Sequence, residues 1–317
     1  MSFMKGNKIL SIKLSDIGLP YFTANGTRAA GLFQDMKDLK SVPEYLNLKN
    51  ATSFENMFKG CTYLENAPLF DTSNGTNFHG MFRDTRRIHE VPEYDTSKGT
   101  DFSDMFRGSN ILKAPKIDTS KGNSFYRMFA SAPYLQELPE IITVNGRNFG
   151  YMFNYCKNML NEKEITYDTL AAQNFSYMFN ECHNMKVAPI MNTYNGKSFA
   201  FMFNNCYNLV TIPKLYLTNA EESYFDENNM ATYSGFSNMF NGCSNLENIT
   251  IQGYIYHNIN FYSCQKLTHE SLMSIINALG NFSSSSEKHT CYLGSTNLAK
   301  LSDEEKAAAT VKGWTLY

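Results

Sequence analysis

The stretch Phe54-Glu55-Asn56-Met57-Phe58 decides the fold, because its pattern Phe-x-x-Met-Phe recurs through most of the 317-residue chain. The pattern occurs eight times, and its second Phe falls at positions 58, 82, 106, 129, 153, 179, 203 and 240. Degenerate copies end at Phe33 and Phe261. Successive copies lie about 24 residues apart, except where an insertion of about 13 residues precedes Phe240. A fixed interval of this length is the signature of a tandem repeat.

Other positions recur in step with that second Phe, so the whole unit repeats. An apolar residue stands six positions later in every copy. A proline stands ten positions later in most copies, at Pro43, Pro68, Pro92, Pro139, Pro189 and Pro213, with Pro115 one position early. Two residues after each proline comes a further apolar residue: Tyr45, Phe70, Tyr94, Ile117, Ile141, Met191 or Leu215. Each unit therefore carries a fixed set of residues that we expect to point inward.

A unit of about 24 residues cannot bury its own apolar side, whereas stacked units cover one another. We therefore expect an α+β repeat solenoid, a leucine-rich-repeat-like stack of about ten coils with short parallel strands. The spacing of Phe-x-x-Met-Phe predicts a short helical turn. The strand is predicted just after the proline, as at Leu69-Phe70-Asp71, because proline suits a strand entry or a bend. Asp-Thr-Ser-x-Gly at 71, 95 and 118 predicts turns in which Gly takes positive φ.

Two segments carry a resemblance to a known family. Phe58-Lys59-Gly60-Cys61-Thr62-Tyr63-Leu64 and Phe240-Asn241-Gly242-Cys243-Ser244-Asn245-Leu246 share Phe-x-Gly-Cys-x-x-Leu. With the downstream proline and the Asp-Thr-Ser that precedes Met-Phe, the pattern resembles the BspA-type leucine-rich repeats over roughly residues 28–267. The resemblance implies a leucine-rich-repeat solenoid and a role in adhesion.

The two ends fall outside the repeat and are expected to cap it. Residues 1–27 form the predicted N-terminal cap, in which 8–14 alternate like a strand. Residues 268–317 form the predicted C-terminal cap, with an amphipathic helix at 268–280, a strand at 290–294, a helix that opens at Ser302 and a strand at 314–316. This segment resembles the closing module of repeat proteins encoded by bacteriophages and prophages of gut bacteria, particularly at 293–301 and 312–316.

Charge and composition exclude several classes of partner. The net charge of −2 and a pI near 6.3 leave no excess of cations for a phosphate backbone, which argues against nucleic acid as the main partner. The first residues lack the apolar stretch of a signal peptide. The chain also contains no run of 18 apolar residues, the length needed to span a bilayer. We therefore expect neither a cleaved leader nor membrane insertion.

The cysteines and histidines predict no catalytic or metal chemistry. Six of the seven cysteines share one register, three positions after the second Phe: Cys61, Cys156, Cys182, Cys206, Cys243 and Cys264. Other units place Met36, Thr85, Ser109 or Ala132 there, which predicts a column of small buried residues with free thiols. The six histidines share no register and have no neighbouring nucleophile. We expect no enzyme activity, no metal and no cofactor.

Two features are candidates for recognition. The residues directly after the repeat prolines, here called the post-proline column, vary in type, as expected of an outward face: Glu44, Leu69, Glu93, Lys116, Glu140, Ile190 and Lys214. The insertion, at about 216–235, mixes acids with aromatics and includes Tyr224, Phe225 and Tyr233. It is a tolerated surface loop, a contact loop or a calcium site, and the calcium site is the least favoured because the acids lack the alternating spacing of a calcium loop.

The sequence therefore favours a non-enzymatic recognition or structural protein. The resemblance of the closing segment implies a bacteriophage virion component, in a tail or fibre, that binds a host-surface glycan or protein and docks on other virion proteins, with a homo-oligomer as one arrangement. The BspA resemblance implies the alternative, an adhesin on the bacterial cell surface.

Overall fold

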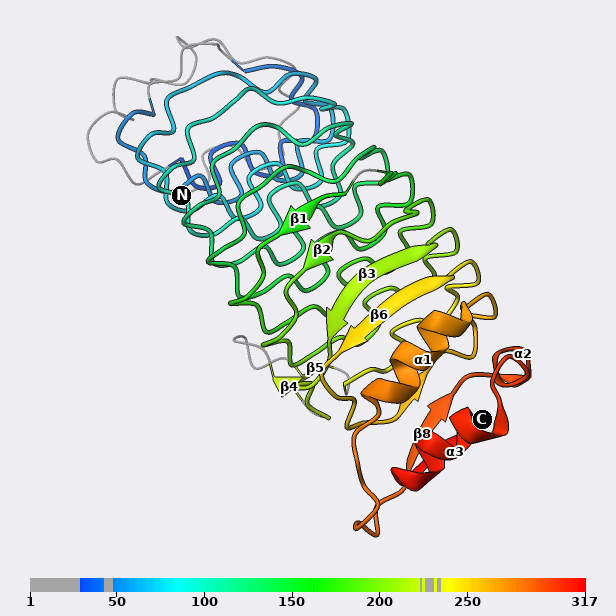
Figure 1. The fold of residues 1–317 in the computed structure, drawn as a ribbon. Helices are drawn as coiled ribbons and strands as arrows, with labels where there is room; N and C mark the ends of the chain where they lie inside the picture. The colour runs from blue at the N-terminus through cyan, green and yellow to red at the C-terminus, as the bar shows by residue number, and fades with distance from the viewer. Residues whose placement is uncertain (1–28, 43–47, 163, 223, 226–230, 233–234) are drawn as a thin grey trace. The chain divides into compact units, whose positions relative to one another are not determined.

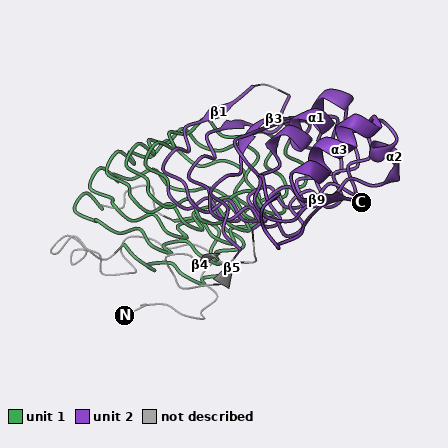
Figure 2. Ribbon diagram, turned by 60° about the horizontal axis from the view of Figure 1, so that its bottom comes forward, with its two compact units in different colours: residues 1–146, 152–159 green, residues 147–151, 160–317 purple. Residues whose placement is uncertain are grey.

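The computed structural model describes residues 29–42, 48–162, 164–222, 224–225, 231–232 and 235–317. These residues belong to two units, which Figure 2 shows in different colours. Unit 1 comprises residues 1–146 and 152–159, and unit 2 comprises residues 147–151 and 160–317. The predicted N-terminal cap at 1–27 lies outside the described residues.

Figure 1 labels most of the helices and strands assigned within the described residues, and all of these elements lie in the residue ranges of unit 2. The strands are β1 (Thr166–Tyr167), β2 (Ile190–Met191), β3 (Thr211–Tyr216), β4 (Tyr224–Phe225), β5 (Ala231–Thr232), β6 (Asn248–Gln252), β7 (Ile259–Asn260), β8 (His289–Tyr292) and β9 (Trp314–Leu316). The helices are α1 (His269–Ala278), α2 (Ser295–Leu298) and α3 (Asp303–Val311). None of these helices has both the length and the hydropathy needed to cross a bilayer.

In each unit the phenylalanines of one repeat stack on their counterparts in the next. In unit 1 the ring centroids of Phe58 and Phe82 lie 5.5 Å apart with planes 11° apart. In unit 2 those of Phe175 and Phe199 lie 5.5 Å apart at 2°. The motif's phenylalanines and methionines are buried in every described copy, as predicted. Each buried Phe stabilises the fold by about 1.5–3 kcal/mol, and stacking adds a smaller term.

Backbone hydrogen bonds join the same segments. Phe58 N donates to Met81 O at 2.9 Å, and Gly60 N donates to Arg83 O at 2.8 Å. Parallel bridges link equivalent residues of successive unit 1 repeats: Ser53, Asn77, Asp101 and Ser124. A buried backbone N–H or C=O must find a partner, and the neighbouring repeat supplies it.

The predicted helical turn at Phe-x-x-Met-Phe is wrong, because the segment forms consecutive reverse turns. Met57 N donates to Phe54 O at 3.1 Å, three residues back, and Asn56 and Gly60 adopt positive φ of 53° and 74°. The same two positions have positive φ in unit 2, as at Tyr177 and Glu181. A helix would direct its N–H groups to its own carbonyls, whereas this conformation turns alternate N–H groups toward the next repeat.

The Asp-Thr-Ser segments form the predicted turns, but their glycines have another role. Ser97 N donates to Asp95 Oδ1 at 3.0 Å, and Thr96 Oγ1 donates to Asp118 O of the next repeat at 2.8 Å. The prediction of positive φ is wrong for Gly99, which is outside that region. A Cβ there would lie 2.5 Å from Phe102 Cζ. Glycine is therefore needed because the turn packs directly on a core ring.

In unit 2 the prediction that the repeat prolines lie at strand entries or bends holds for Pro189, whereas Pro213 lies within a strand. β2 begins directly after Pro189 and pairs in parallel with β1, as predicted. Pro213 lies inside β3, where the register with β6 shifts between Ile212 and Leu215. This irregularity accommodates a residue that cannot donate a ladder bond. In unit 1, the described residues after the prolines form no assigned strand, unlike the prediction.

The elements predicted after residue 268 are confirmed. α1 begins at an N-cap, Thr268, whose hydroxyl accepts from Ser271 N. α3 follows Ser302, which forms a capping box with Glu305. β8 pairs in parallel with both β7 and β9, and α2 is an additional short helix that the pattern did not predict.

Helix α1 covers the last strand of the β3–β6 pair with its serine side chains. Ile249 N and Ile251 N of β6 donate to Ser271 Oγ at 3.0 Å and Ser274 Oγ at 2.9 Å. Ser271 Oγ in turn donates to Glu247 O at 2.9 Å. An uncovered strand edge exposes backbone N–H groups that can pair with another chain, and the two serine hydroxyls accept hydrogen bonds from these groups in β6.

Gly99→Ala is expected to destabilise the protein by about 1–3 kcal/mol, because the added methyl overlaps the Phe102 ring and overpacks the core. Lys121→Ala, in the equivalent turn of the next repeat, is an exposed control expected to change stability by less than about 0.5 kcal/mol. Urea unfolding of both variants measures the difference. Equal stability of Gly99→Ala and the wild type would contradict the packing role.

Candidate recognition surfaces

The post-proline column of unit 1 is exposed above a buried framework. Leu69 is 64% exposed, and Glu93, Lys116 and Glu140 are also exposed. One residue further along, Phe70, Tyr94 and Ile117 are buried, and Ile141 is half-buried. The framework is anchored between repeats, since the Tyr94 hydroxyl donates to Pro68 O at 2.6 Å. The outward orientation predicted for these four residues agrees with their exposure.

The two column residues of unit 2 are less exposed than predicted. Ile190 in β2 and Lys214 in β3 are both half-buried. The Lys214 Nζ lies 5.1 Å from the Tyr216 ring centroid. This cation–π contact holds the Lys214 side chain close to the strand. Glu44 and Tyr233 lie outside the described residues, and Tyr224 and Phe225 are described only as the backbone of β4.

The two described ends of the insertion meet in unit 2. Gly235 N donates to Glu221 O at 2.9 Å, which joins the two ends of the loop. Between them β4 and β5 pair as an antiparallel ribbon. A hollow of about 550 Å³ lies at this base, bordered by Glu222, Phe236, His257 and neighbouring residues. The sequence predicted a contact loop or a tolerated loop here but not the hollow.

Unit 2 also carries an aromatic and an amide ladder that the sequence analysis missed. The rings of Tyr151, Tyr177 and Phe201 stack with centroids 4.4 and 4.6 Å apart, and all three residues are half-buried. Asn204 Nδ2 donates to Asn180 Oδ1 at 2.7 Å, and Asn241 Nδ2 donates to Asn204 Oδ1 at 2.9 Å. Both ladders could have been predicted from the sequence, because the aromatic residues stand two positions before the second Phe of each repeat and the asparagines stand one position after it.

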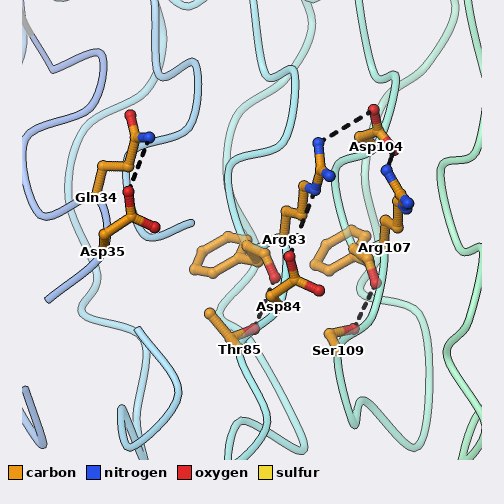
Figure 3. Close-up of polar contacts among 10 residues, drawn as sticks. Gln34, Asp35, Arg83, Asp84, Thr85, Asp104, Arg107 and Ser109 are labelled. Carbon is orange, nitrogen blue, oxygen red and sulfur yellow. Dashed lines mark hydrogen bonds and ion pairs between the residues drawn. The ribbon is translucent and has the colours of Figure 1, made fainter. Parts of the chain in front are cut away.

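Unit 1 contains a compact ion cluster around a buried carboxylate (Figure 3). Asp104 Oδ2 lies 3.8 Å from Arg83 Nη1, and its Oδ1 lies 3.4 Å from Arg107 Nη1. Asp104 is 5% exposed and adopts a positive φ of 56°. Because a buried charge requires partners, the two guanidinium groups hold Asp104 at this backbone position. The cluster has a structural role between neighbouring repeats.

The seven cysteines are free and buried, as predicted for the six in register. Cys61 Sγ donates to Phe33 O at 3.0 Å, and Cys156 Sγ donates to Phe129 O at 3.1 Å, in each case to the preceding repeat. Where the slot holds Thr85, its hydroxyl donates to Phe82 O of its own repeat at 2.7 Å (Figure 3). Burial raises the pKa of the Cys61 and Cys156 thiols to about 12, so they remain protonated at neutral pH.

Metal-ligating side chains do not gather within the part of the chain that the structure describes, where no group of three or more His, Cys, Asp or Glu could hold an ion. Several histidines instead have local partners. His183 Nε2 lies 2.7 Å from Glu181 Oε2, and His269 Nε2 lies 2.9 Å from Glu305 Oε1. The absence of enzyme activity stays a prediction.

The stacked repeats and their repeated anchors define a tandem-repeat protein, and comparison with protein families assigns the family. The model described as "Mycoplasma protein of unknown function, DUF285" matches residues 27–141 and 123–251. The two matches together span more than half of the chain, which therefore belongs to the DUF285 family. No curated protein matches the chain.

Proposed function

We propose that this protein is a non-enzymatic recognition protein whose repeats, over about residues 28–267, form a solenoid. The observation that carries the proposal is the post-proline column of unit 1. Leu69, Glu93, Lys116 and Glu140 are exposed and chemically unlike one another, although the residues around them repeat. A regular interior that carries variable outward residues supplies an extended binding surface.

The proposed partner is a glycan or protein on a host cell surface, and the proposed location is the tail or fibre of a bacteriophage virion. The resemblance of residues 293–301 and 312–316 to closing modules of phage and prophage repeat proteins supports this location. Within a virion the chain would also contact other virion proteins or further copies of itself. The overall charge of −2 favours these partners over nucleic acid.

A second candidate is a bacterial cell-surface adhesin of the BspA kind. The resemblance of the repeats to the BspA-type leucine-rich repeats supports it, and the family to which the chain belongs is described by Mycoplasma proteins of unknown function. Both candidates use the same outward column. They differ in the particle or cell that displays the chain.

Mass spectrometry of purified virions and of cell envelopes from the source culture separates the two candidates. The virion proposal expects the chain in purified particles at a stoichiometric level. Recovery only in the envelope of uninfected bacteria would overturn that proposal in favour of the adhesin. Absence from both fractions would contradict both.

The double variant Glu93→Lys and Glu140→Lys reverses two charges of the column and is expected to reduce binding to host cells at least tenfold, because a partner fitted to the two carboxylates loses its electrostatic complementarity when both charges are reversed. Its stability should change little, since both side chains are exposed. Glu90→Lys, exposed in the same unit but outside the column, is the matched control. A pull-down of labelled protein with intact cells measures the effect, and equal binding of all forms would remove the column from the interface.

A further inference from the structure

The hollow at the base of the insertion has the size of a small-ligand site. Its volume is about 550 Å³, within the range of about 300–1,000 Å³ usual for such pockets. The residues that bear on its chemistry are Glu222, Phe236, His257, Asn258, Asn260 and Tyr292. They come from both ends of the insertion, from the last degenerate repeat and from β8, so the fold brings together segments distant in sequence.

The degenerate repeat places polar groups where the other repeats have core residues. His257 stands at the first Phe of Phe-x-x-Met-Phe, and Asn260 stands at the Met. Ile259 is buried in their place, whereas His257 is half-buried and Asn260 is exposed. The first degenerate repeat instead keeps a small buried residue, Ala29, at the Phe position. Polar residues that break a packing rule at a hollow are typical of functional sites.

Two asparagines with fixed side-chain oxygens line the hollow. Asn258 Oδ1 accepts from Thr290 N at 2.7 Å, and Asn260 Oδ1 accepts from Tyr262 N at 2.8 Å. Because only an amide oxygen can accept a backbone N–H, these bonds fix the orientation of both side chains. Neither Nδ2 group donates to any described residue. Both asparagines line the hollow and are exposed, so their amino groups are accessible to a ligand.

Acceptors and an aromatic surface complete the site. His257 Nε2 lies 2.9 Å from Ala220 O, and its Nδ1 lies 3.5 Å from Glu222 Oε1. The Glu222 side chain is 76% exposed and has further acceptor capacity. Tyr292 is 39% exposed, and its ring packs on Tyr317 at a centroid distance of 5.7 Å.

We propose that this hollow binds a neutral saccharide. Sugar hydroxyl groups both donate and accept, which suits exposed amide groups beside a carboxylate acceptor, and the apolar ring faces of a sugar suit an exposed tyrosine. The carboxylate of Glu222 disfavours an acidic ligand. This inference rests on the proposed recognition function and assigns one ligand class to one site, apart from the post-proline column.

Asn258→Asp and Asn260→Asp test the site with little change in shape. Aspartate keeps the oxygen that accepts the backbone N–H, but it removes the amino donor and adds a negative charge beside Glu222. The probes are immobilised oligosaccharides that end in mannose, galactose or N-acetylhexosamine, with sialic acid-terminated counterparts. Full-length wild type is expected to bind neutral probes, and each variant is expected to lose at least tenfold in affinity.

Asn123→Asp, at an exposed asparagine of unit 1, is the control for added charge and should bind as the wild type does. Thermal unfolding of every variant shows whether the fold is kept. The proposal is overturned if the wild type binds no neutral probe, or if correctly folded Asn258→Asp and Asn260→Asp bind as the wild type does.

Host-cell binding by the same proteins separates this inference from the proposed function. If the wild type binds cells, and the two asparagine variants bind cells and saccharides as well as the wild type does, the proposed saccharide site is overturned while the recognition function stands. If the wild type binds neutral saccharides through the hollow but no host cell, the host-recognition function is overturned and the saccharide site stands.

Discussion

The contact between successive repeats is the interaction on which the rest of the structure depends. A single repeat buries Phe and Met side chains that it cannot cover by itself, so each core ring needs its counterpart in the next repeat. In unit 1, Phe54, Phe78 and Phe102 stack with centroids 5.5 and 5.7 Å apart. The backbone follows the same rule, because Phe58 N and Gly60 N donate to the following repeat. The burial of apolar side chains and the hydrogen bonding of backbone N–H groups therefore both depend on the contact between one repeat and the next.

This boundary explains the unusual backbone of the motif. Two positions per repeat adopt positive φ, which costs about 1–2 kcal/mol for a residue with a side chain. Glycine avoids the cost at Gly60, Gly80 and Gly108, and neighbouring side chains occupy the space this leaves. A carboxylate oxygen of Asp84 would lie 2.3 Å from a Cβ added at Gly108. The strain is offset by hydrogen bonds that a helix could not make between repeats.

The periodicity predicted the buried positions well and the local conformation poorly. The burial of the Phe, Met and Cys positions could be predicted because residues that recur at one position of every repeat face the shared core. The helical turn was wrong because a spacing of three and four residues also fits consecutive reverse turns, and Gly and Asn at 56, 60 and 80 were the contrary signal. The elements after residue 268 were predicted because capping residues such as Thr268 and Ser302 act locally. The hollow could not be predicted, since it depends on Glu222, His257 and Tyr292 meeting in space.

Hydrogen exchange of the backbone amides tests the central claim most directly. If the repeats are held by bonds to their neighbours, the amides of Phe58, Gly60 and Phe82 will be strongly protected, although they lie in turns rather than helices or strands. Protection at these positions should be lost together, because each repeat's bonds depend on the adjacent one. Exchange at the rate of an unstructured peptide at these amides would contradict the account.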